Sequence, residues 1–182
     1  MIGNAKKSIV LSTFDLRPDD SGTKIIAALY TAAERGVQVQ ILIDGIYQKL
    51  FLEKSPVFQA LAAHQNIEVG IYNPVTNLMR LNYRMHDKYL IIDESMYLLG
   101  GRNTNDIFLG DKKTRINVDR DIFVYEETQG KGESLQALEK YFDAIWNEAQ
   151  VRKKKKTYAA SYEEKYKSEY HQLKERYRSL KE

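Results

Sequence analysis

The first 44 residues follow a strand-helix-strand pattern, which constrains the fold more than any other feature of the sequence. Residues 7–14 contain the apolar run IVL without helical spacing and predict a largely buried strand. Residues 22–35 carry apolar side chains on one helical stripe, and Gly36 follows where helices often end. Residues 37–44 (VQVQILID) predict a second strand. Because a strand that returns through a helix pairs in parallel with the first, the pattern predicts a right-handed βαβ unit.

Further strands and helices are predicted as far as residue 148. They are a helix at 57–64, a strand at 67–72, a hairpin-like strand pair at 89–93 and 97–99, a strand at 122–125 and a helix at 135–148. Residues 74–83 read as a loop. We therefore expect an α/β fold with a mixed, largely parallel central sheet flanked by helices. The chain has 182 residues, 43% of them hydrophobic, which suits one core, placed here in a domain of residues 1–150.

The basic character of the chain is confined to residues 151–182. This segment holds 11 Lys/Arg against 5 Asp/Glu, a charge of +6, and subtracting it from the total of +3 leaves −3 for residues 1–150. The charge of the whole chain is therefore no argument for a basic binding surface on the globular part. The absence of cysteine excludes disulfides and thiolate chemistry.

Residues 151–182 also predict an amphipathic helical tail or linker with a tyrosine stripe. Two interpretations are open: the stripe and its basic face lie on an anionic membrane, or the stripe packs on a missing second half or another copy of the chain. The stripe consists of Tyr158, Tyr162, Tyr166, Tyr170, Leu173, Tyr177 and Leu180.

The opening residues, MIGNAKKSIV, lack the apolar run of a signal peptide. No run approaches the roughly 20 apolar residues of a transmembrane helix. We therefore expect neither element in this segment.

Residues 85–106 (MHDKYLIIDESMYLLGGRNTND) concentrate the side chains that suggest chemistry. His86 and Lys88 lie two residues apart at the mouth of a predicted strand, so they share one face. Asn103 follows a turn at Gly100 and Gly101, where backbone and amide donors can approach an anion. A nucleophile, a cation and a neutral donor together suit phosphoryl transfer.

A neutral His86 can attack phosphorus if a carboxylate holds its other ring nitrogen. Asp121 is the candidate for that carboxylate, and Asp119 is the alternative on the same side of the strand. The alternative interpretation of Asp121 is structural: it forms an ion pair with Arg120 or Arg115. For Arg102 and Asp106, the sequence leaves two interpretations equally open: a charged surface residue or a residue that contacts the substrate.

These residues match the pattern His-x-Lys-x4-Asp-x6-Gly-x2-Asn of the phospholipase D superfamily, as His86, Lys88, Asp93, Gly100 and Asn103. The resemblance extends over residues 5–148 through residues 27–44, DRDIF at 119–123 and FDAIWN at 142–147. Within the superfamily the segment is most similar to the first catalytic motif, in the N-terminal half, of bacterial cardiolipin synthases.

The resemblance implies a role for each motif residue. His86 is the nucleophile, Lys88 and Asn103 bind the substrate phosphate together with the Gly101 backbone, and Asp93 is mainly structural. Neither a metal nor a cofactor is implied. Members of the superfamily need two such motifs, because one histidine attacks while the other protonates the leaving alcohol.

This chain contains one motif, since neither His64 nor His171 is followed by a lysine two residues on. The resemblance therefore implies a partner: a second half-domain in cis, or a second copy of the chain. The favoured interpretation is a phosphatidyltransferase or phospholipase D that acts on a phosphatidylglycerol-like lipid through a phosphohistidine intermediate. The resemblance also implies a bacterial protein that is peripheral to the cytoplasmic side of the membrane.

Two alternatives are kept. One is a homodimeric nuclease, although a charge of −3 on residues 1–150 makes nucleic acid a less favoured partner. The other is a half-domain that binds anionic lipid or phosphate without turnover.

Overall fold

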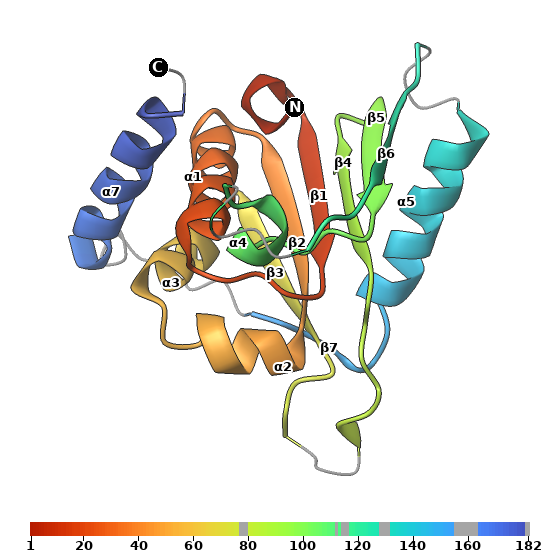
Figure 1. The fold of residues 1–182 in the computed structure, drawn as a ribbon, viewed down its shortest axis with the longest axis horizontal. Helices are drawn as coiled ribbons and strands as arrows, with labels where there is room; N and C mark the ends of the chain where they lie inside the picture. The colour runs from red at the N-terminus through yellow and green to blue at the C-terminus, as the bar shows by residue number, and fades with distance from the viewer. Residues whose placement is uncertain (77–79, 112, 114–116, 128–131, 155–163, 181–182) are drawn as a thin grey trace.

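The computed structural model describes residues 1–76, 80–111, 113, 117–127, 132–154 and 164–180. A seven-stranded mixed sheet with the strand order β6-β5-β4-β1-β2-β3-β7 forms the centre of the domain (Figure 1). The strands are β1 (Ser8–Thr13), β2 (Gln38–Asp44), β3 (Ile67–Tyr72), β4 (Lys88–Ile92), β5 (Met96–Gly100), β6 (Asp121–Tyr125) and β7 (Val151–Lys153). The predicted α/β fold with a mixed sheet is confirmed.

Parallel pairing is limited to the centre of the sheet. β1 pairs in parallel with β2, and β2 with β3, which confirms the predicted βαβ unit. β4, β5, β6 and β7 all join through antiparallel pairings, the β4 and β5 hairpin among them. The sheet is therefore less parallel than the sequence predicts, because short hairpin strands and a short edge strand extend both sides of its parallel centre.

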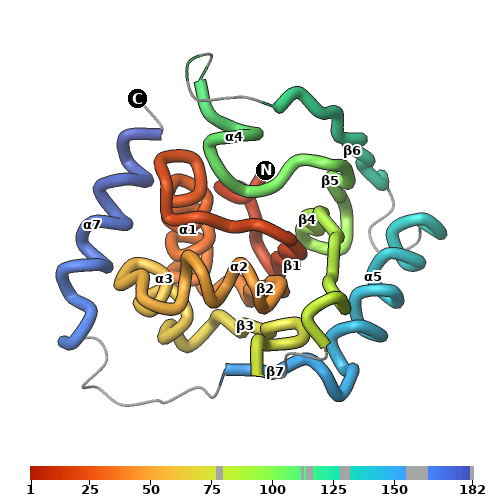
Figure 2. The backbone as a smooth tube through the Cα atoms, turned by 60° about the horizontal axis from the view of Figure 1, so that its bottom comes forward, coloured from red at the N-terminus to blue at the C-terminus, as the bar shows by residue number. Residues whose placement is uncertain are grey.

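The helices lie on the two faces of the sheet. They are α1 (Asp20–Glu34), α2 (Gly45–Tyr47), α3 (Pro56–Ala63), α4 (Asp106–Leu109), α5 (Glu133–Trp146) and α7 (Lys167–Arg178), with η1 (Ile2–Asn4) and η2 (Gln48–Leu52) as short irregular turns. α1, α3 and α7 lie on one side of the sheet and α5 on the other (Figure 2). None of the helices in the described ranges is long and apolar enough to cross a membrane.

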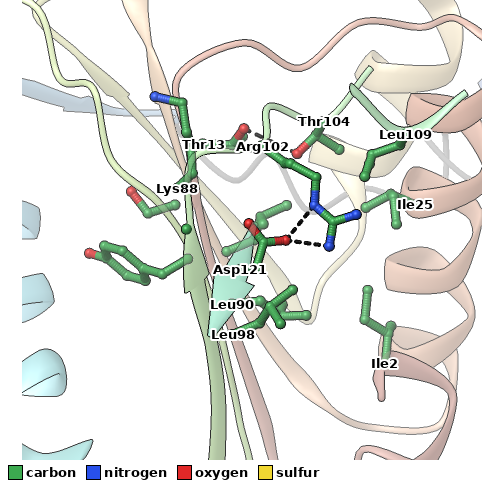
Figure 3. A pocket seen from close by; sticks show the side chains of 14 residues that line it. Ile2, Thr13, Ile25, Lys88, Leu90, Leu98, Arg102, Thr104, Leu109 and Asp121 are labelled. Carbon is green, nitrogen blue, oxygen red and sulfur yellow. Dashed lines mark hydrogen bonds and ion pairs between the residues drawn. The ribbon is translucent and has the colours of Figure 1, made fainter. Parts of the chain in front are cut away.

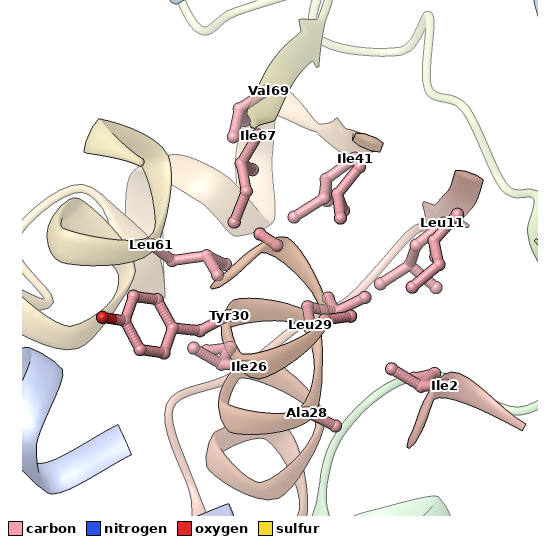
Figure 4. Packing of buried hydrophobic residues seen from close by; sticks show 14 of the residues in the cluster. Ile2, Leu11, Ile26, Ala28, Leu29, Tyr30, Ile41, Leu61, Ile67 and Val69 are labelled. Carbon is pink, nitrogen blue, oxygen red and sulfur yellow. The ribbon is translucent and has the colours of Figure 1, made fainter. Parts of the chain in front are cut away.

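The alternation of side chains along the strands divides the core between these two faces. Ile41 of β2 packs in the cluster that includes Ile26 and Leu29 of α1 (Figure 4). Its neighbour Leu42 points to the opposite face and packs with Phe142 and Trp146 of α5. Both faces of β2 are covered, which explains the unbroken apolar run from Ile41 to Ile43.

Helix α1 begins and ends as its sequence dictates. The Asp19 carboxylate accepts a hydrogen bond from the Gly22 N–H at 2.9 Å and caps the first turn. Gly36 follows the last turn with a φ of 93°, a left-handed conformation that favours glycine. The helix therefore leads directly into β2 and closes the βαβ unit.

The structure of residues 151–154 and 164–180 differs from the tail or linker that the sequence predicts. Val151 pairs antiparallel with Tyr72, so the sheet continues past residue 150. In α7, Leu173 is completely buried, and the Tyr170 ring stacks on Tyr30 of α1 with ring centroids 5.0 Å apart.

Ion pairs join the same two helices, since Lys174 contacts Glu34 at 2.7 Å and Arg176 contacts Asp20. Tyr170, Leu173 and Tyr177 of the stripe thus pack on the chain's own domain, whereas Leu180 is 42% exposed. Tyr158 and Tyr162 lie outside the described residues.

Candidate phosphodiester site

The predicted site forms where four strand ends meet. Thr13 at the end of β1 pairs with Lys88 at the start of β4, and Gly100 at the end of β5 pairs with Asp121 at the start of β6. Because Tyr89 pairs with Leu99, Lys88 lies beside Gly100. The antiparallel order of these strands thus brings both ends of the motif to one edge of the sheet.

His86 lies just before β4 and is exposed to solvent. Its ring packs edge-on against Phe14, with centroids 4.5 Å apart at an interplanar angle of 60°. Among the described residues, no hydrogen-bond partner is found for its ring nitrogens, which leaves a nitrogen lone pair available to an incoming electrophile.

Lys88 is only 7% exposed and lies beside the same aromatic ring. Its Nζ donates a hydrogen bond to the His86 carbonyl oxygen at 2.6 Å and lies 5.2 Å from the Phe14 ring centroid. Burial lowers the pKa of Lys88, and the negative charges of Asp87, Asp119 and Asp15 oppose this only in part. A poorly hydrated cation beside a histidine is well placed to bind a phosphate oxygen.

Asn103 lies on the loop that follows β5 and is 8% exposed. Its side-chain Oδ1 is buried without a hydrogen-bond partner among the described residues. Oδ1 can only accept a hydrogen bond, so it does not bind a phosphate oxygen; the Nδ2 amino group of the same amide is the group that can donate to one.

The loop that carries Asn103 is fixed to the end of β1 and to α1. Thr104 N–H donates to the Asp15 carbonyl oxygen at 2.9 Å, and the Thr104 and Thr13 hydroxyls lie 3.1 Å apart. Asp106 accepts a hydrogen bond from the Ser21 N–H at 2.7 Å, in the first turn of α1. Asp106 therefore joins α4 to α1, and this structural role explains the residue without a contact to substrate.

The structure corrects the pairing expected for Asp121. Its carboxylate accepts a hydrogen bond from Arg102 Nε at 2.6 Å and forms an ion pair with the same guanidinium. The described residues show no hydrogen bond between Asp121 and His86, nor an ion pair with Arg120, and Arg115 lies outside them. The register places Asp121 opposite Gly100, whose missing side chain leaves room for the Asp121 carboxylate, and Arg102 follows two residues later.

The alternative carboxylate, Asp119, lies on the same side of the site. A side chain at Gly101 would bring a Cβ atom within 2.0 Å of Asp119 Oδ2, so this carboxylate fills the space beside Gly101. Asp119 also contributes to the electrostatic potential at Lys88.

Asp93 lies at the opposite end of β4, about 17 Å from Lys88 for five residues of extended strand. Its carboxylate accepts hydrogen bonds from the N–H groups of Lys6, Lys7 and Ser8 at 2.8, 2.7 and 3.0 Å. Burial raises the pKa of Asp93, but these three donors outweigh it and the net pKa is lowered. Asp93 fixes the start of β1 to the β4 and β5 hairpin.

Asp44 supports the histidine segment and was not singled out from the sequence. It is completely buried at the end of β2, and its carboxylate accepts from the Met85 N–H and from Arg84 Nη1, each at 3.2 Å. Arg84 Nη2 donates to the Asn73 carbonyl at 2.9 Å. Burial raises the pKa of Asp44. The only sequence signal was an acidic residue ending an apolar strand.

The arrangement defines a class of protein: an α/β domain that presents an exposed histidine, a buried lysine and an amide where strand ends meet, a set of groups that suits phosphoryl binding. A family model described as the cardiolipin synthase, PLD-like domain matches residues 1–146. The chain belongs to this family of phosphodiesterases and phosphatidyltransferases.

Known relatives agree with this assignment. The chain is 34% identical over 148 residues to a cardiolipin synthase from Clostridium perfringens, covering 81% of this chain and 30% of the relative. It is 39% identical over 106 residues to cardiolipin synthase B from Escherichia coli, covering 56% of this chain and 25% of the relative. The chain thus spans less than a third of the length of these curated relatives.

Solved structures share the fold. The phospholipase D family member Nuc from Salmonella typhimurium has a TM-score of 0.61 at 21% identity, with 85% of this chain and 86% of that chain covered. Phosphatidylserine synthase from Haemophilus influenzae has a TM-score of 0.63 at 16% identity, covering 98% of this chain and 40% of that chain.

Proposed function

We propose that this chain supplies one of two motifs for phosphodiester transfer on phospholipids, with His86 as the nucleophile. The observation that carries the proposal is the meeting of His86, Lys88 and the Asn103 loop at one strand edge, in a domain of the cardiolipin synthase family. The substrate we propose is a phosphatidylglycerol-like lipid, reached from the membrane surface of a bacterium.

The proposed reaction proceeds in two displacements. A neutral His86 ring nitrogen attacks phosphorus, the bond from phosphorus to the alcohol oxygen breaks, and the phosphatidyl group becomes bound to the histidine. Lys88 and Asn103 bind the phosphate oxygens while charge develops on them. A second alcohol then takes the phosphatidyl group, which gives cardiolipin, or water takes it, which gives phosphatidic acid.

The first displacement needs an acid, because glycerol leaves as a poor alkoxide unless its oxygen is protonated. His64 does not fill this role, since its Nε2 lies 3.1 Å from Glu34, on the α1 side of the sheet. We propose that the acid comes from a second half-domain or from a second copy of the chain.

The experiment is turnover of phosphatidylglycerol vesicles by the chain and by a protein that carries both motifs, with released glycerol and the lipid products measured separately. We expect glycerol release that is abolished by His86→Gln and preserved in the matched variant His171→Gln, which alters an exposed histidine of α7. Cardiolipin among the products indicates transfer, and phosphatidic acid indicates hydrolysis.

Two outcomes contradict the proposal. His86-dependent nicking of plasmid DNA without lipid turnover identifies the nuclease. Lipid binding that survives His86→Gln but falls with Lys88→Ala, without turnover by the chain or by a protein that carries both motifs, identifies a binding module.

A further inference from the structure

An apolar pocket of about 170 Å³ lies directly beside the proposed phosphate site (Figure 3). The inner face of the sheet forms one wall, and η1, α1 and α4 form the other. Its aliphatic lining consists of Ile2, Leu11, Ile25, Leu90, Leu98 and Leu109. The side chains come from six separate elements, so the pocket is built by the fold and not by one local segment.

The mouth of this pocket is polar and continuous with the site. Lys88, Thr13 and Thr104 border it, and Lys88 belongs to both the pocket and the phosphate site. The Arg102 guanidinium lies across the space above Leu90 and Leu98, held by Asp121 (Figure 3).

The charges at the mouth suit an anion outside and a neutral group inside. Arg102 and Asp121 neutralise each other, since they form an ion pair. Lys88 has no carboxylate partner within ion-pair distance among the described residues, and the more distant charges of Asp87, Asp119 and Asp15 offset its positive charge only in part. An anionic phosphate is attracted to this rim, whereas the aliphatic walls favour an uncharged occupant.

We infer that the pocket receives the end of a hydrocarbon chain of the lipid whose phosphodiester lies at Lys88. This deepens the proposed function and rests on it. The pocket is similar in size to an engineered apolar cavity of about 150 Å³ that stays dry and binds benzene. An amphiphile that occupies rim and pocket together is selected over a soluble phosphodiester, because each buried methylene group raises affinity about fourfold.

The test is a chain-length series measured on the intact chain by calorimetry, below the micelle concentration of each lipid. The probes are glycerophosphoglycerol and phosphatidylglycerols with acyl chains of four, six and eight carbons. We expect affinity to rise about fourfold for each methylene group that enters the pocket, and then to level off when the pocket is full.

Leu98→Trp fills the pocket, and we expect it to abolish this dependence while the affinity for glycerophosphoglycerol stays unchanged. The matched control is Leu99→Trp, because Leu99 is the next residue of β5, points to the opposite face and is 40% exposed. Ile25→Phe fills the pocket from α1 and replaces Leu98→Trp if circular dichroism shows that this variant does not fold.

Equal affinities along the series, or the same dependence on chain length in both pocket variants, overturn the inference. Loss of self-association in Leu98→Trp, without an effect of chain length, also overturns it and assigns the pocket to a second copy. These failures differ from failure of the proposed function, in which glycerophosphoglycerol binding itself does not depend on Lys88.

Discussion

Replacing Asp93 by asparagine separates a structural from a catalytic role for this motif residue. Asparagine has nearly the same shape and tolerates the positive φ of 54° at this position, so the backbone is not strained. It loses the negative charge, and one of its two oxygens becomes an NH2 group that faces the N–H donors of residues 6–8.

The expected loss of stability follows from these contacts. A hydrogen bond to a charged group contributes about 1.5–3 kcal/mol when buried. The donors of Lys6 and Lys7 are near water, which screens the charge and reduces the effect. We expect Asp93→Asn to lower the free energy of unfolding by about 1–2 kcal/mol, which shifts the Tm of a domain of this size by roughly 2–8 °C.

The pH dependence has a definite sign. The folded state holds the pKa of Asp93 below its usual value, so its stabilising effect is complete above the unfolded pKa of about 4 and is lost as pH falls through the folded pKa. The difference between Asp93→Asn and the parent chain is therefore constant from about pH 7 to pH 5 and shrinks in acid.

The assay is guanidinium unfolding followed by the fluorescence of Trp146, the single tryptophan, which is 4% exposed. Glu94→Gln is the matched control, because Glu94 is the adjacent exposed carboxylate and also has a positive φ, of 50°. Phosphodiester affinity should not change in either variant, since Asp93 is remote from Lys88. Unchanged stability together with lost phosphodiester binding in Asp93→Asn would refute this reasoning.

Three further predictions concern α7, Asp44 and Lys88. Leu173→Ala should lower the free energy of unfolding by about 2–5 kcal/mol, because it leaves a cavity between α7 and α1, whereas Leu180→Ala, at 42% exposure, should have little effect in the same denaturation assay. Asp44→Ala should destabilise the chain by about 3–5 kcal/mol, because Arg84 loses its buried partner. The control is Asp143→Ala, on the exposed side of α5. Equal unfolding midpoints for the two variants would contradict the role given to Asp44. Since the pKa of Lys88 is lowered, phosphodiester affinity should fall with rising pH before ordinary lysines titrate, and Lys88→Arg should remove this fall in a calorimetric pH series.

Features that depend on local patterns were predicted from the sequence. The stripe of α1 and the apolar run of β2 depend on spacing within single elements, and the structure forms both. The spacing from His86 to Asn103 likewise predicted that these residues lie close together, because a hairpin brings the end of its second strand beside the start of its first.

Features that depend on partners distant in sequence were not predicted. The bond from Asp44 to Met85 spans 41 residues, and nothing near Asp44 indicates it. β7 has three residues, two of them charged, a composition that does not predict a strand. It pairs with the outer edge of β3, where Val151 lies opposite Tyr72. The sequence made Asp121 a candidate partner of His86, but in the structure the Asp121 carboxylate accepts a hydrogen bond from Arg102.

The central claim, that His86 is a nucleophile toward phosphorus, can be tested without a second motif. An aryl phosphodiester such as bis(p-nitrophenyl) phosphate releases a stable phenolate, so its displacement needs no acid. The measurement is mass spectrometry of the chain after reaction with this diester. We predict an acid-labile aryl phosphate adduct on His86 that is absent from His86→Gln and unchanged in His171→Gln. Release of phenolate with no adduct on His86, or an adduct on another residue, would contradict the account.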